Sequence, residues 1–148
     1  AKSNVVYPVK SPFQYFENTG TLQNPIFSSD RTNNFFGKID ARGINQVTGY
    51  SAPTLLEIEG ELQLFVGNEE GEILQYEGIE NNVEGTFVEV TNNYGNLVVG
   101  TEIHPAFADI DKDGFLEVAV GNIRGGISFF KTDLKNCAIS LSCFSTLS

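Results

Sequence analysis

Residues 108–122, ADIDKDGFLEVAVGN, combine acidic side chains at a spacing that suits a hard metal ion. The acids at positions 1, 3, 5 and 9 of this stretch, counted from the first aspartate, are Asp109, Asp111, Asp113 and Glu117. Calcium takes about six to eight oxygen ligands, and a loop that curls around the ion points alternate residues inward. Gly114 permits the sharp turn, and Phe115 at position 7 is expected to offer its backbone carbonyl and leave its ring for the core.

Two other interpretations of this loop compete with a calcium site of this kind. A helical calcium hand needs a bidentate Glu at position 12, where this chain has Val120, and it needs flanking helices. A solvated turn is the second alternative, because Asp-Gly is a strong turn dipeptide. Neighbouring carboxylates about 4 Å apart repel by about 1 kcal/mol in water and about 4 at an effective dielectric of ~20. We therefore expect one structural Ca²⁺ here; Mg²⁺ fits less well because it retains most of its water.

The segments around this loop have the pattern of β-strands. Apolar residues alternate with polar ones over short runs, and Gly, Asn and Asp separate the runs, whereas helical periodicity is missing. The runs are 62–67, 72–77, 86–90, 115–121 and 126–131. The sequence therefore predicts an all-β protein with tight turns.

An internal repeat organises these strands. Residues 51–77 align with residues 104–131, with an offset of 52 before the acidic loop and 54 after it, so that Gly67 matches Gly121. Residues 12–27 echo residues 72–87 as a third, partial copy. The loop 57–63 of the first full copy is two residues shorter and lacks the third acid, so we expect it to hold no metal.

A repeat of about 50 residues with about four short strands has the size of one propeller blade. The predicted fold is two to three four-stranded antiparallel blades of a β-propeller. Closed propellers need about four to eight blades, so this chain alone does not close the ring. The expected parts are propeller blades over 1–131, comprising a partial blade at about 1–36, a full blade at about 51–95 and the calcium-loop blade at about 104–131, and a C-terminal tail at 132–148 that is a candidate outer strand.

Residues 104–131 resemble a VCBS or FG-GAP repeat, the blade family of integrin-α-like propellers, and the resemblance covers about residues 5–131. Residues 12–27 and 51–77 resemble the tandem versions in secreted and surface proteins of Bacteroidetes-type bacteria. The resemblance implies a calcium loop between the first two strands of a blade, and a secreted or cell-surface bacterial location. Its ligands would be the side chains of Asp109, Asp111, Asp113 and Glu117 and the carbonyl of Phe115. Glu117 departs from the Asp usual at its position.

Composition limits the partners. The formal charge is −10, from 19 acids and 9 bases, which argues against nucleic acid and anionic membranes. No run approaches the ~18 apolar residues of a membrane span, and the opening residues lack both Met and a signal core, so we expect a mature, trimmed or partial chain. The expected partners are other blades of a longer chain or other subunits, together with a protein or glycan ligand.

Cys137 and Cys143 lie in an alternating segment near the end of the chain. A strand there would hold the sulfurs about 20 Å apart at ~3.3 Å per residue, too far for a disulfide, whose Cα atoms lie within about 7 Å. The strand and the intrachain disulfide exclude each other, and we favour the strand with two buried thiols.

No set of residues in the sequence marks a catalytic site. The single histidine, His104, is expected at the surface, and neither a nucleophilic triad nor a zinc cluster can be assembled. The tyrosines outside the best-matched strands suit packing better than a sugar-stacking platform; they are Tyr7, Tyr15, Tyr50 and Tyr94. We therefore expect a non-catalytic interaction, adhesion or scaffolding module. The alternative is the propeller domain of a polysaccharide-degrading lyase or hydrolase.

Overall fold

The structure, a computed structural model, describes residues 13–33, 35–43, 46 and 50–136. In these residues it is all-β, as predicted, with two single-turn 3₁₀ helices and no α-helix. The strands are β1 (Tyr15–Asn18), β2 (Phe27–Asn33), β3 (Ser51–Ile58), β4 (Glu61–Asn68), β5 (Ile73–Glu77), β6 (Val88–Thr91), β7 (His104–Ala108), β8 (Phe115–Gly121) and β9 (Ile127–Lys135). The 3₁₀ helices are η1 (Phe36–Lys38) and η2 (Tyr94–Asn96).

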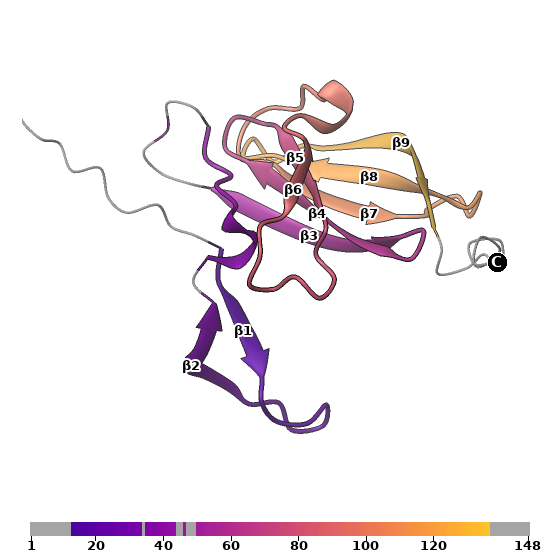
Figure 1. The fold of residues 1–148 in the computed structure, drawn as a ribbon. Coiled ribbons are helices and arrows are strands. Elements are labelled where there is room, and N and C mark those ends of the chain that lie inside the picture. Colours follow the sequence, from indigo (N-terminus) through magenta and orange to yellow (C-terminus); the bar gives the residue numbers. More distant parts are fainter. Residues whose placement is uncertain (1–12, 34, 44–45, 47–49, 137–148) are drawn as a thin grey trace, which may run out of the picture.

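The strands form three antiparallel sheets, and none of them closes on itself. The first sheet is the β1–β2 hairpin, the second has the order β3-β4-β5-β6, and the third has the order β7-β8-β9. Strands adjacent in the chain are adjacent in each sheet, as short Gly-, Asn- and Asp-containing connections require. Figure 1 shows the first sheet standing apart at one end while the second and third sheets lie together.

The second and third sheets pack face to face through β3 and β4 on one side and β7 on the other. Their shared core is made of Ile58, Phe65, Ile73, Ile103, Val118 and Val120. The opposite face of the second sheet is covered by the segment around Ile39 and Ala41 together with Phe87. Phe65 and its neighbour Val66 point to opposite faces and are both 0% exposed. Strand β4 is therefore buried on both sides, which explains its continuous apolar run.

The segment that leads into the third sheet, Ile103 to Pro105, comes very close to the second sheet at Gly67 of β4. A Cβ built there would stand 2.2 Å from the carbonyl oxygen of Ile103 and 2.7 Å from Cδ of Pro105. Next to this contact, Ile103 N–H donates to the carbonyl of Asn68 at 3.1 Å. The hydroxyl of Thr54 donates to the Pro105 carbonyl at 2.8 Å. A residue without a side chain at Gly67 thus lets the third sheet join the second by main-chain contacts.

The strand registers agree with the internal repeat. Pro53 pairs with Val66 in the second sheet, as Pro105 pairs with Val120 in the third. The first sheet resembles the later half of the second in being one antiparallel strand pair with an irregular register, although the interval from Tyr15 to its partner Asn33 is two residues longer than that from Gln75 to Thr91. The resemblance between residues 12–27 and 72–87 thus corresponds to a similar strand pair.

A further repeated element, η1 and η2, was not predicted from the sequence. Each follows the last strand of a sheet, and each has a glycine of positive φ at its centre, Gly37 at 66° and Gly95 at 68°. The residues after η1 cover the second sheet, and Leu97 and Val99 after η2 pack into the core of the third. The signal that could have revealed this element is the pair FGKI and YGNL at 36–39 and 94–97.

Two details differ from the sequence prediction. Strand β9 continues through Lys135, past the end of the predicted strand run at 131, because the Thr132 hydroxyl donates to the Leu116 carbonyl at 2.6 Å and Leu134 packs on the shared core. The ring of Phe115 is exposed and does not enter the core. Strand alternation explains this, since Phe115 lies on the face of β8 opposite Val118 and Val120, which point into the shared core.

Within the described part of the chain, no helix has the length and apolar character that a membrane crossing requires.

Candidate metal centre

The predicted calcium loop is the connection between β7 and β8. The β7–β8 ladder ends at the pair Ala108 and Glu117. The equivalent pair in the second sheet, Leu56 and Gln63, is followed by two more pairs before the turn. That turn consists of Glu59 and Gly60, with φ of 53° and 87°, as a tight two-residue hairpin needs. The longer β7–β8 connection instead leaves residues 109–114 to form an open loop.

Three of the four predicted acids come together in this loop. Asp109, Asp111 and Glu117 each offer a carboxylate oxygen, and these oxygens lie within 4.8 Å of one another. Glu117 is only 7% exposed, Asp109 is half-buried and Asp111 is exposed. The cluster therefore has a buried floor and an open side toward solvent.

Backbone N–H groups of the loop hold one oxygen of each carboxylate. Glu117 Oε2 accepts from Ile110 N–H at 2.8 Å, and Asp109 Oδ2 accepts from Gly114 N–H at 3.1 Å. Asp111 Oδ1 accepts from Asp113 N–H at 3.3 Å. These bonds fold the loop back over its own acids, and the positive φ of Gly114, 91°, allows that reversal.

The remaining oxygens of the two inner carboxylates have no protein partner. Asp109 Oδ1 and Glu117 Oε1 are buried and make no hydrogen bond. A buried acceptor without a donor costs roughly 1–3 kcal/mol, and more when it is charged. Two such oxygens close to a third carboxylate form an all-oxygen donor set, which is the kind that Ca²⁺ prefers. The residues present therefore fit a bound divalent cation.

Asp113, the fourth predicted acid, lies outside the group of three and pairs with a lysine from β9. Lys131 Nζ lies 2.6 Å from Asp111 Oδ2 and 3.0 Å from Asp113 Oδ2. The hydrogen bond from Lys131, assisted by the N–H of Phe115, lowers the pKa of Asp113 below its ordinary value. The two aspartates in turn raise the pKa of Lys131. Lys131 is therefore a firmly charged ammonium at the mouth of the cluster.

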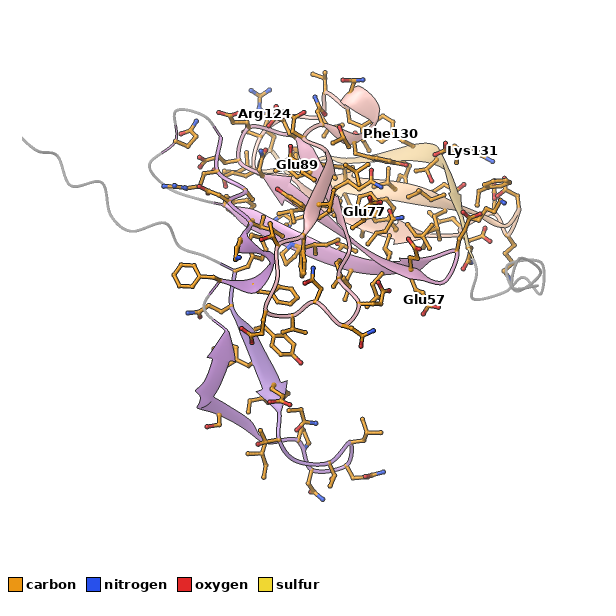
Figure 2. The ribbon with its side chains drawn as sticks, in the orientation of Figure 1. Glu57, Glu77, Glu89, Arg124, Phe130 and Lys131 are labelled. Carbon is orange, nitrogen blue, oxygen red and sulfur yellow. The ribbon has the colours of Figure 1, made fainter. Side chains whose placement is uncertain are left out.

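Sequence reasoning missed two residues of this site, Lys131 and Asn136. The backbone N–H of Asn136 donates to the Gly114 carbonyl at 2.9 Å, and its side-chain amide donates to Asp109 Oδ2 at 3.4 Å. Lys131 faces Glu117 across the β8–β9 ladder, and Figure 2 labels it together with Glu77 of the second sheet. The repeat aligns Tyr76 with Phe130, so Lys131 stands at the position of Glu77. This change from an acid to a base beside the acidic loop is the sequence signal that could have identified Lys131.

The shorter hairpin of the second sheet does not gather its acids in this way. Glu57 and Glu59 are both exposed, and Lys135 Nζ lies 3.0 Å from Glu59 Oε1. Within the described residues, the cluster at Asp109, Asp111 and Glu117 is the one group of three or more such side chains with metal-binding spacing.

The other residues singled out from the sequence lie elsewhere. His104 is exposed and contacts the hydroxyl of Tyr50 through Nε2. The ring of Tyr94 packs edge-on against Phe65, with centroids 5.3 Å apart, and Tyr15 stacks on Phe36 at 5.4 Å. These two tyrosines are packing residues. Tyr7, Cys137 and Cys143 lie outside the described residues.

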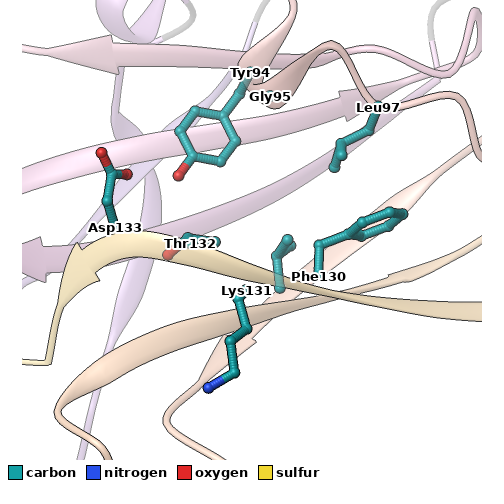
Figure 3. Close-up of a pocket in the computed structure, with 8 residues that line it drawn as sticks. Tyr94, Gly95, Leu97, Phe130, Lys131, Thr132 and Asp133 are labelled. Carbon is teal, nitrogen blue, oxygen red and sulfur yellow. The ribbon is translucent and has the colours of Figure 1, made fainter.

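A pocket of about 400 Å³ lies between η2 and β9. Figure 3 shows the Tyr94 hydroxyl directed toward Thr132 and Asp133, and the side chain of Lys131 extending away from that ring. The lining is mainly apolar, from Leu97, Val118 and Phe130. The backbone of Lys131 therefore borders the pocket, while its side chain contacts Asp111 and Asp113 of the acidic loop on the opposite side of β9.

Comparison of the chain with protein-family models, with curated proteins and with solved structures finds no match.

Proposed function

We propose that this chain is a calcium-binding β-propeller module of an exported protein, with a non-catalytic interaction or scaffolding role. The observation that carries the metal assignment is the pair of buried, unpartnered oxygens, Asp109 Oδ1 and Glu117 Oε1, within a group of three carboxylates. A bound Ca²⁺ would supply the charge and the coordination that these oxygens lack. Asp113 and the carbonyl of Phe115 are proposed as its further ligands.

The ion would be structural in this proposal. The loop joins β7 to β8, and its N–H groups donate hydrogen bonds to the acids that would hold the ion. Ion binding would therefore stabilise the end of this hairpin. A ligand that binds only the folded state stabilises it by about 2.7 kcal/mol at a hundred times its dissociation constant. For a chain of this length, that raises the melting temperature by roughly 5–10 °C.

Thermal unfolding in excess Ca²⁺ and in EDTA tests the metal site, together with the substitution Glu117→Gln. We expect Ca²⁺ to raise the melting temperature of the wild-type chain, and Glu117→Gln to weaken Ca²⁺ binding at least tenfold. Glu57→Gln is the matched control, because it removes an exposed acid from the equivalent hairpin and should leave binding unchanged. Equal melting temperatures in Ca²⁺ and EDTA would contradict the metal site.

The interaction role is supported by the outer face of the third sheet. Ile73 lies between the second and third sheets and is 1% exposed, whereas its counterpart in the repeat, Ile127, is 68% exposed. Phe129 is exposed on the same face. A further sheet of the same kind, from a longer chain or another subunit, would cover these residues as the third sheet covers the second, in the manner of successive propeller blades. Measurement of the mass in solution tests this, since a strictly monomeric chain at high concentration argues against association through this face.

A further inference from the structure

The carboxylate oxygens of the candidate metal centre are not equally available. One oxygen of each acid in the group of three accepts from a loop N–H. Of the three that remain, Asp109 Oδ1 and Glu117 Oε1 have no partner. The third, Asp111 Oδ2, has Lys131 Nζ at 2.6 Å. A cation that uses all three acids therefore meets an ammonium group at one of them.

The position of Lys131 in the repeat makes this arrangement specific to the acidic loop. Lys131 stands opposite Glu117 in the third sheet, and the repeat places Glu77 at the same point beside the shorter hairpin of the second sheet. At this position of the repeat, the sheet with the acidic cluster therefore has the basic residue Lys131, and the sheet without such a cluster has the acidic residue Glu77. Lys131 is also exposed, so its side chain has solvent into which it can move.

A lysine ammonium has three donors and no acceptor, so it cannot become a ligand of the metal. It also repels a divalent ion. At about 5 Å in water, this repulsion lowers a binding constant roughly tenfold. The same ammonium also holds Asp113 Oδ2, which lies 3.0 Å from Nζ and is proposed as a further ligand.

We propose that Lys131 is an internal competitor of the metal ion. Without metal, its ammonium neutralises Asp111 and Asp113 and holds the loop together. When a divalent cation binds, Lys131 releases both aspartates and moves into solvent, so that Asp111 and Asp113 can act as ligands. This inference rests on the proposed function, and it assigns to Lys131 the regulation of that site: the lysine weakens metal binding and keeps the loop folded in its absence.

Calorimetric titration of the whole chain with Ca²⁺ at fixed ionic strength tests the proposal, on wild type, Lys131→Gln and Lys131→Arg. We expect Lys131→Gln to bind Ca²⁺ about tenfold more tightly than wild type, and Lys131→Arg to bind within about threefold of it because the charge is kept. Lys135→Gln is the matched control, since it removes the same charge from the same strand but from a lysine paired with Glu59. Its affinity should stay within about twofold of wild type.

Thermal unfolding of the same variants adds a second readout, the melting temperature without metal and its increase when Ca²⁺ is added. In EDTA, Lys131→Gln should melt below wild type, because its acids are no longer neutralised. In saturating Ca²⁺, its gain in melting temperature should exceed that of wild type. A lysine that only stabilises the fold would lower the melting temperature in both states by the same amount and leave the affinity unchanged.

The outcomes separate this inference from the function on which it rests. If wild type binds Ca²⁺ and Lys131→Gln binds equally or more weakly, the competitor role is wrong and the metal site stands. If neither protein binds Ca²⁺, the metal site itself is wrong and the competitor role falls with it. If Lys135→Gln tightens binding as much as Lys131→Gln, the effect is one of net charge and the assignment to Lys131 is overturned.

Discussion

The junction between the second and third sheets at Gly67 gives the sharpest test of how this fold is held together. The substitution Gly67→Ala would place a methyl group 2.2 Å from the Ile103 carbonyl oxygen and 3.0 Å from its carbon. Both of these are backbone atoms, so no side chain can rotate away to relieve the overlap. The two sheets would have to separate by about 1 Å or distort β4, and overpacking of this kind costs about 1–3 kcal/mol, occasionally more.

The repeat supplies a matched control at Gly121. This residue occupies the same place in β8, but a Cβ built there meets nothing within 4 Å. Neither glycine has a positive φ, so in both cases alanine also restricts the unfolded chain and gains about 0.4–1 kcal/mol. We therefore expect Gly121→Ala to be neutral or slightly stabilising. Because the overlap at Gly67 is with backbone atoms, its cost lies at the upper end of that range, and Gly67→Ala should lose about 2–2.5 kcal/mol net of the gain.

Urea unfolding of both variants, followed by circular dichroism, measures the difference. At about 2–4 °C per kcal/mol, Gly67→Ala should also lower the melting temperature by roughly 4–10 °C. If Gly67→Ala is as stable as wild type, the close packing of the sheets at this point is refuted. If Gly121→Ala is equally destabilised, the cost comes from the strand itself and not from the contact with Ile103.

Two further predictions concern the buried rings. Phe65→Ala should destabilise the chain by about 3–5 kcal/mol in urea unfolding, because the ring is fully buried between Tyr94 and Phe107; a loss below 1 kcal/mol would contradict this packing. Burial, followed by the nearby Glu89, raises the pKa of Tyr76 well above its ordinary value of 10.0. Stability should therefore fall as the pH rises above about 10, where the unfolded chain releases a proton that the native phenol retains. Tyr76→Phe should make this alkaline loss less steep in pH-dependent urea unfolding, and an unchanged slope would argue against it.

The strand content was predictable because alternation and turn residues are local signals. The runs at 115–121 and 62–67 became β8 and β4 within a residue at each end. The repeat added information across the chain, since an offset that changes only at the acidic loop implies matching registers on both sides of it. The pairing of Pro53 with Val66, repeated by Pro105 with Val120, follows from that offset.

The candidate site was predictable in its acids but not in its basic residue. Asp109 and Asp111 are close in sequence to Glu117, so one loop brings all three together. Lys131 comes from another strand, and its contact with Asp111 depends on cross-strand register and on the length of its side chain. The exposed ring of Phe115 was mispredicted for a related reason, because its face is set by strand alternation and not by its hydrophobicity.

The arrangement of the sheets has a consequence for how the chain unfolds. Apart from pairs within one sheet, the elements in closest contact are β3 and β4 with β7, and β5 with η2. The first sheet is linked to the second through η1, because Tyr15 of β1 stacks on Phe36 and Phe36 packs on Phe87 just before β6. The chain is thus a short linear array in which each unit depends on its neighbour, and opening can proceed from either end. In amide hydrogen exchange, β4 should be the last strand to exchange and the β1–β2 hairpin among the first.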